Sequence, residues 1–184
     1  MGFSYHAGAM IRVLTIPGLW NSGPRHWQSH WEAADPQVVR VVQRDWETPV
    51  REEWVATVEA AVARAGPGVV LAGHSLGCAT LAFWALETRL RVAGLLLVAP
   101  SDTEAPSYPP GTTGFAPLPL RPLPFRSIVV ASSDDAYLTM ARARTFAAAW
   151  GAELVEAGAH GHLNSDSDLG PWPLGQAQLA RLLA

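Results

Sequence analysis

The chain has 184 residues, a formal net charge of −3 and a sequence pI near 6.0. Hydrophobic residues make up 49% and charged residues 16%, the composition of a globular domain with a well-buried core. Basic residues do not outnumber acidic ones, so the chain lacks the positive charge that nucleic-acid binding requires. The apolar runs are too short to span a membrane. We therefore expect one domain over residues 1–184 with neither partner.

Strand-like and helix-like segments alternate along the chain. Apolar, β-branched runs predict strands over 11–16, 38–42, from Val69 into the motif at 73–77, and over 92–98, 125–131 and 152–157. Helical spacing predicts helices over 22–34, 49–65, from the same motif to about Leu90, and over 137–150 and 173–183. This βα alternation predicts an α/β fold, a mostly parallel sheet with helices on both faces.

The motif is a Gly-x-Ser-x-Gly sequence centred on Ser75, between a strand and a helix. Strand, sharp turn and helix in this order are typical of a nucleophile elbow. The serine of such a turn adopts a strained backbone, and Gly73 and Gly77 leave room because neither has a Cβ. We predict Ser75 as the nucleophile, and we expect His74 to point away from it and make a structural hydrogen bond.

A serine hydroxyl is a poor nucleophile at neutral pH and needs a base that a third group orients. In α/β-hydrolases the acid and the histidine follow the serine along the chain, at the ends of later strands. The residues that qualify are Asp102, Asp134 and Asp135 for the acid and His160 and His162 for the base.

Several short segments together resemble one known family. They are residues 16–23 (IPGLWNSG), 26–32 (HWQSHWE), the elbow, 131–135 (ASSDD), 150–151 (WG), 161–164 (GHLN) and 170–173 (GPWP). In this order and spacing they look like the small serine hydrolases grouped with retinoblastoma-binding protein 9 and its bacterial YdeN-like relatives. The resemblance covers nearly the whole chain, and it implies a compact α/β-hydrolase fold without a large cap domain.

The resemblance also implies a Ser-Asp-His triad, which maps onto Ser75, Asp135 and His162. His162 alone fits the family pattern Gly-His-hydrophobic-Asn, and His160 is its rival. The mammalian member is named for a Leu-x-Cys-x-Glu motif that binds retinoblastoma protein. The nearest string here, residues 76–80, ends in threonine and lies within the elbow, so we do not expect that partner.

An oxyanion hole needs two backbone N–H donors beside the reacting carbon. We assign one to Leu76, directly after the nucleophile. The other comes from the loop after the first strand, where we assign Leu19 with Trp20 as the alternative. Pairs of histidines at 26 and 30 and at 160 and 162 lack further ligands at metal-binding spacing, so we expect no metal and no cofactor.

The stretch from Ala99 to Phe125 contains eight of the fifteen prolines, too many for a helix or an interior strand. It follows a strand and so begins at the same sheet edge as Ser75. We expect it to form a wall of the substrate cleft, the alternative being a rigid surface connector.

Cys78 is the single cysteine, which excludes an internal disulfide, and we interpret it as a small core residue. Residues 1–6 lack the charged start and apolar run of a signal peptide, so we expect a cytoplasmic protein.

These features predict a serine hydrolase that cleaves small carboxylic esters, or thioesters or amides, through an acyl-enzyme on Ser75. Its partner is then a small-molecule ester or amide substrate. The alternative is a non-catalytic binding protein that keeps the fold. The sequence leaves the natural substrate and the oligomeric state open.

Overall fold

The structure, a computed structural model, describes residues 10–184, so the segment behind our expectation on targeting lies outside the described residues. Six strands form one sheet in the order β2-β1-β3-β4-β5-β6, and every neighbouring pair is parallel. They are β1 (Val13–Ile16), β2 (Val38–Arg40), β3 (Val70–His74), β4 (Gly94–Val98), β5 (Ser127–Ala131) and β6 (Glu153–Glu156). The predicted parallel sheet is confirmed.

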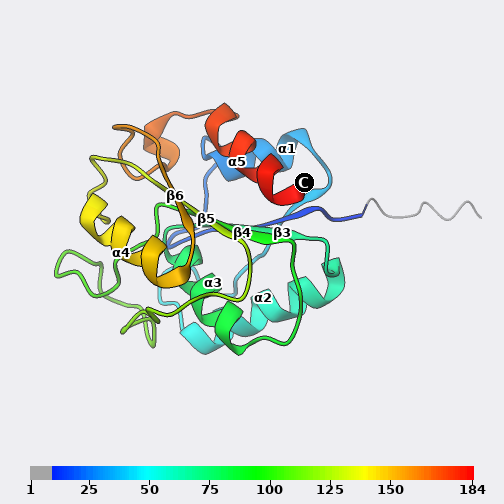
Figure 1. Cartoon of the computed structure of the whole chain (residues 1–184), viewed down its shortest axis with the longest axis horizontal. Coiled ribbons are helices and arrows are strands. Elements are labelled where there is room, and N and C mark those ends of the chain that lie inside the picture. The colour runs from blue at the N-terminus through cyan, green and yellow to red at the C-terminus, as the bar shows by residue number, and fades with distance from the viewer. Residues whose placement is uncertain (1–9) are drawn as a thin grey trace, which may run out of the picture.

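Helices cover both faces of this sheet, as predicted (Figure 1). On one face lie α1 (Trp27–Ala34) and α5 (Pro173–Leu183). On the other lie α2 (Arg51–Ala65), α3 (Leu76–Glu87) and α4 (Met140–Trp150). Along the described part of the chain, no helix is long and apolar enough to cross a membrane.

The central strands are buried on both faces, which explains their uninterrupted apolar sequences. Side chains of β4 alternate between the two layers: Leu95 and Leu97 pack with α2, α3 and α4, whereas Leu96 and Val98 pack with α1 and α5. Cys78 is buried among these side chains, as its interpretation as a core residue required.

Four helix ends differ from the prediction. Helix α2 begins at Arg51 instead of Pro49, after the extended residue Val50, and α4 begins at Met140 instead of Tyr137, after the extended residue Thr139. The first helix begins at Trp27 instead of Ser22, because the His26 side chain accepts the Gln28 N–H at 3.2 Å and caps the helix there. The elbow helix ends at Glu87 instead of Leu90, because Thr88 is extended and its hydroxyl accepts the Leu90 N–H. A short 3₁₀ helix (Ser165–Ser167) was not predicted, since three residues carry no periodicity.

The strand order places a crevice at one point of the sheet edge. From β1 the chain runs outward to β2 and returns on the other side of β1 as β3. The loops that follow β1 and β3 therefore diverge at the carboxyl ends of these two strands, where ligands bind in open α/β sheets. Leu19 lies in the first of these loops and Ser75 at the second.

Candidate active site

The turn at Ser75 has the strained geometry expected of a nucleophile elbow. Ser75 has φ 56° and ψ −122°, a region that residues with a side chain rarely adopt. A Cβ on Gly77 would collide with the carbonyl oxygen of Ile16, so only glycine allows this turn to approach β1. A Cβ on Gly18 would lie 2.7 Å from the Cβ of Ser75, so the β1 loop packs directly on the elbow.

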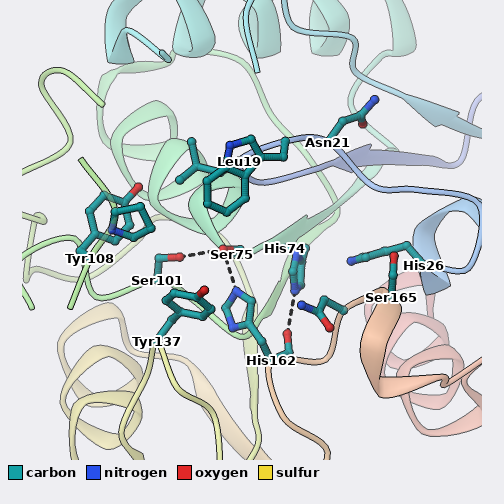
Figure 2. A pocket seen from close by; sticks show the side chains of 13 residues that line it. Leu19, Asn21, His26, His74, Ser75, Ser101, Tyr108, Tyr137, His162 and Ser165 are labelled. Carbon is teal, nitrogen blue, oxygen red and sulfur yellow. Dashed lines mark hydrogen bonds between the residues drawn. The ribbon is translucent and has the colours of Figure 1, made fainter. Parts of the chain in front are cut away.

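The three residues predicted as the triad lie in one chain of hydrogen bonds. Figure 2 shows its first part, the contact between Ser75 and His162. The Nε2 atom of His162 lies 2.9 Å from the Ser75 Oγ, and its Nδ1 lies 2.9 and 2.8 Å from the two carboxylate oxygens of Asp135. An ionised carboxylate can only accept, so Nδ1 carries the proton and Nε2 is free to accept the serine hydroxyl proton.

The main-chain N–H of Tyr137 helps to hold the Asp135 carboxylate in place. The Asp135 side chain is 0% exposed, and its Oδ1 accepts the N–H of Tyr137 at 2.8 Å. The Tyr137 ring packs edge-to-face on His162 with centroids 4.7 Å apart. Asp135 therefore lies at the end of β5 with a fixed orientation toward the imidazole.

Asp134, the neighbouring candidate acid, fastens the loop that carries His162. Its Oδ1 accepts the Ser132 hydroxyl at 2.8 Å and the Gly161 N–H at 2.7 Å. These hydrogen bonds, the Ser132 one first, lower the pKa of Asp134. The Ser132 Oγ also accepts the N–H of His160 at 2.8 Å, so the end of β5 and the histidine loop are joined directly.

The other rivals lie apart from the Ser75 hydroxyl. Asp102 forms a two-point ion pair with the Arg142 guanidinium on α4, at 2.8 and 2.9 Å. The side chain of His160 is exposed, and the hydrogen bonds that this residue makes run through its main chain. Neither residue is brought to the Ser75 hydroxyl, whereas His162 contacts it directly and Asp135 contacts His162.

Two backbone N–H groups at the elbow are available to an oxyanion. The Trp20 N–H donates to the carbonyl oxygen of Trp46 at 2.9 Å and is therefore already used. Among residues 10–184, the N–H groups of Leu19 and Leu76 have no hydrogen-bond acceptor. They belong to the two segments that meet where Gly18 packs on Ser75.

Ser101 is a site residue that our sequence reasoning missed. Its hydroxyl lies 2.7 Å from the Ser75 hydroxyl and is buried. If the Ser75 hydroxyl donates to the His162 Nε2, the Ser101 hydroxyl donates to Ser75 and limits the rotation of the Ser75 side chain. The only available signal was its position just after β4, the strand next to β3.

Two further histidines lie beside His162 in a row. The His74 Nε2 donates to the carbonyl oxygen of His162 at 2.9 Å, which is the structural hydrogen bond that we expected. His74 does not point away, however: its ring lines the cleft, 4.9 Å from that of His162. His26 packs against it with ring centroids 4.6 Å apart. Burial, then the charge of Arg40, lowers the pKa of His26 to about 3, and burial lowers that of His74 strongly.

Acid should destabilise the fold partly through His26. On lowering the pH the unfolded chain protonates this group near pH 6.5 but the folded chain only near 3, so stability is full above 6.5 and falls below it. At about pH 4.5 the loss is roughly 2 to 3 kcal/mol. Urea unfolding at pH 7 and 4.5 measures how much the free energy of unfolding falls in acid. This fall should be smaller for His26→Asn than for wild type or His30→Asn; equal falls would contradict the prediction.

The cleft at this sheet edge encloses about 670 Å³ of empty space, including its open mouth. Tyr108 and Pro109 of the proline-rich stretch line it, so the predicted cleft wall is confirmed. Trp20, 62% exposed, lies at its rim. Over residues 10–184 no three His, Cys, Asp or Glu side chains are grouped as metal ligands.

Comparison with known proteins adds a family and a fold. A sequence model of a family described as serine hydrolase matches residues 13–181. No curated protein sequence matches the chain. A solved structure from Pectobacterium atrosepticum, described as a YdeN-like hydrolase, has 31% sequence identity and a TM-score of 0.82, covering 94% of this chain and 90% of that one.

Two more distant structures share the fold. The ydeN gene product of B. subtilis has 20% identity and a TM-score of 0.72, covering 93% of this chain and 97% of that one. An α/β-hydrolase enzyme from the metagenome of Mar Chica lagoon sediments has 13% identity and a TM-score of 0.68, covering 95% and 90%.

Proposed function

The chain belongs to the serine hydrolase family, and from this premise we propose that it cleaves small carboxylic esters through an acyl-enzyme on Ser75. The observation that carries the proposal is the continuous hydrogen-bond chain from Ser75 through His162 to the buried Asp135. A strained serine at the mouth of a cleft, with two unused N–H groups beside it, supports the same chemistry.

In the first half-reaction the Ser75 Oγ attacks the ester carbonyl carbon while the His162 Nε2 takes the hydroxyl proton. Asp135 holds the imidazole in the required tautomer and stabilises its positive charge. The carbonyl oxygen becomes negative and accepts hydrogen bonds from the N–H groups of Leu19 and Leu76. When the carbon–oxygen bond to the alcohol breaks, His162 transfers its proton to the leaving oxygen, and the acyl group stays on Ser75.

The second half-reaction repeats these roles with water. His162 takes a proton from a water molecule, which attacks the acyl carbonyl carbon. The second oxyanion collapses, the bond to the Ser75 Oγ breaks, and His162 returns the proton to that oxygen. The products are a carboxylic acid and the free enzyme. Thioesters and amides can follow the same route, because only the leaving atom differs.

A fluorophosphonate probe, which forms a covalent bond with an activated serine hydroxyl, tests this proposal. The purified protein should be labelled and should hydrolyse short p-nitrophenyl esters. A non-catalytic binding protein with this fold would show neither reaction. The natural acyl and alcohol groups can be sought by a screen of small esters, thioesters and amides once labelling is established.

The identity of the acid can be tested with two matched substitutions. Asp135→Asn keeps the shape of the side chain but favours the wrong imidazole tautomer, so kcat should fall by up to about 10⁴. Asp102→Asn removes the ion pair with Arg142 instead and should leave kcat within about threefold of wild type. Esterase kinetics of both variants decide the matter; near-normal turnover of Asp135→Asn with an inactive Asp102→Asn would move the acid to the end of β4.

A further inference from the structure

One buried polar atom in the cleft has no role in the chemistry described above. The Nε2 atom of His26 has no hydrogen-bond partner within residues 10–184, although the residue is only 2% exposed. Burying a polar group without a partner is costly, so most such groups in proteins are satisfied. The neighbouring ring of His74 lies edge-to-face and offers at most a weak contact. The ring of His26 lines the cleft (Figure 2).

The protonation state of His26 follows from its other contacts. Its Nδ1 accepts the N–H of Gln28 at 3.2 Å, so Nδ1 carries no proton. Burial holds the ring neutral at pH 7, because it lowers the pKa to about 3. A neutral imidazole has one N–H, which must therefore be on Nε2. The cleft thus contains a buried, uncharged hydrogen-bond donor.

Asn164 supplies a second donor in the same cleft. Its side-chain oxygen accepts the N–H of Asp166 at 3.0 Å, which fixes that end of the amide as oxygen. Its NH₂ group is the remaining end, and Asn164 lines the cleft together with His26. This part of the wall therefore presents donors from two different segments.

The His26 donor lies on the side where the alcohol of an ester must bind. His162 protonates the leaving oxygen, so the leaving group lies toward His162 from Ser75. The rings of His162, His74 and His26 follow one another at 4.9 and 4.6 Å. Figure 2 shows Ser101 and Tyr108 on the opposite side of Ser75.

We propose that His26, aided by Asn164, forms a leaving-group subsite that selects esters whose alcohol carries a hydrogen-bond-accepting oxygen. The oxygen of an ether or hydroxyl group, a few bonds from the ester oxygen, would accept the His26 Nε2–H. An unsubstituted alkyl alcohol of the same length would leave this buried donor unpaired and would be the poorer substrate. The inference rests on the proposed ester hydrolysis.

Two isosteric acetates test the subsite. In 2-methoxyethyl acetate an ether oxygen replaces one CH₂ group of n-butyl acetate, and kcat/KM for each can be measured by titrating the released acid. We expect the ratio of the two values to be about 3- to 10-fold higher for wild type than for His26→Asn. Asparagine keeps the helix cap but lacks the reach of Nε2. Comparing ratios between proteins cancels the intrinsic reactivity of each ester.

The controls separate this effect from general damage. His30→Asn changes a histidine on the same helix outside the cleft and should keep the wild-type ratio. Asn164→Asp keeps the oxygen that accepts the Asp166 N–H but removes the amide donor, so it should also lower the ratio. This variant provides the test if His26→Asn does not fold. As an acyl-side pair, p-nitrophenyl methoxyacetate and butanoate should show no dependence on His26.

Each remaining outcome overturns the proposal. A ratio that is the same in wild type, His26→Asn and Asn164→Asp means that neither side chain forms a hydrogen bond with the alcohol group. A His26 dependence found only in the acyl-side pair would place the subsite on the other side of Ser75. If wild type hydrolyses none of the four esters, the proposed function itself fails and the subsite fails with it.

Discussion

Ser75→Ala should abolish labelling by a fluorophosphonate and lower the kcat of ester hydrolysis by about 10⁶. The hydroxyl is the only atom of the protein that forms a bond to the substrate in the proposed route. Removing one buried hydroxyl from a turn whose backbone is set by Gly77 and by β1 should leave the fold intact. Thermal unfolding followed by circular dichroism checks this point.

Ser101→Ala is the matched control for this experiment. Its hydroxyl is buried in the same cleft and contacts the Ser75 hydroxyl at 2.7 Å. The His162 imidazole is hydrogen-bonded to Ser75 and not to Ser101, so Ser101 has no base to take its proton. The variant should still be labelled, because Ser75 keeps its hydrogen bond to His162. Labelling that survives in Ser75→Ala, or disappears only in Ser101→Ala, would show that Ser75 is not the nucleophile.

The sheet was predictable because its strands are buried on both faces. Strands β3, β4 and β5 must be apolar at every position to pack against helices on each side, and this requirement is visible as uninterrupted runs. The likeness to YdeN-like hydrolases, drawn from short motifs, is confirmed by the family and by the 31% identical structure. Helix ends were less predictable, because single side chains such as His26 and Thr88 decide them.

The candidate site was partly predictable because its residues follow strands that could themselves be predicted. Ser75, Asp135 and His162 each come after such a strand, and their order along the chain is the order of a Ser-Asp-His triad in α/β-hydrolases. The contact of Ser101 with Ser75 was not predictable, because it depends on how the ends of two adjacent strands pack. The free donor on His26 was not predictable either, because it depends on which hydrogen bonds the folded chain leaves unmade. Such pairings arise from packing and leave no spacing pattern in the sequence.

His162→Ala should lower kcat by at least about 10³ and by as much as about 10⁶, because a serine without its base is barely nucleophilic. His160→Ala should stay within about threefold of wild type. Both variants should fold. His160 holds the loop through its main chain, with its N–H donating to Ser132 and its carbonyl oxygen accepting from Ser167.

His162 likewise keeps its main-chain hydrogen bond from His74 when its ring is removed, so the two substitutions differ mainly in which imidazole is lost. Steady-state kinetics on p-nitrophenyl acetate, with fluorophosphonate labelling as a second readout, compares them directly. The structure places the His162 Nε2 2.9 Å from the Ser75 Oγ and leaves the His160 ring exposed, so the losses should be very unequal. If His160→Ala loses activity and His162→Ala does not, His160 is the base and the hydrogen-bond chain through Asp135 is structural.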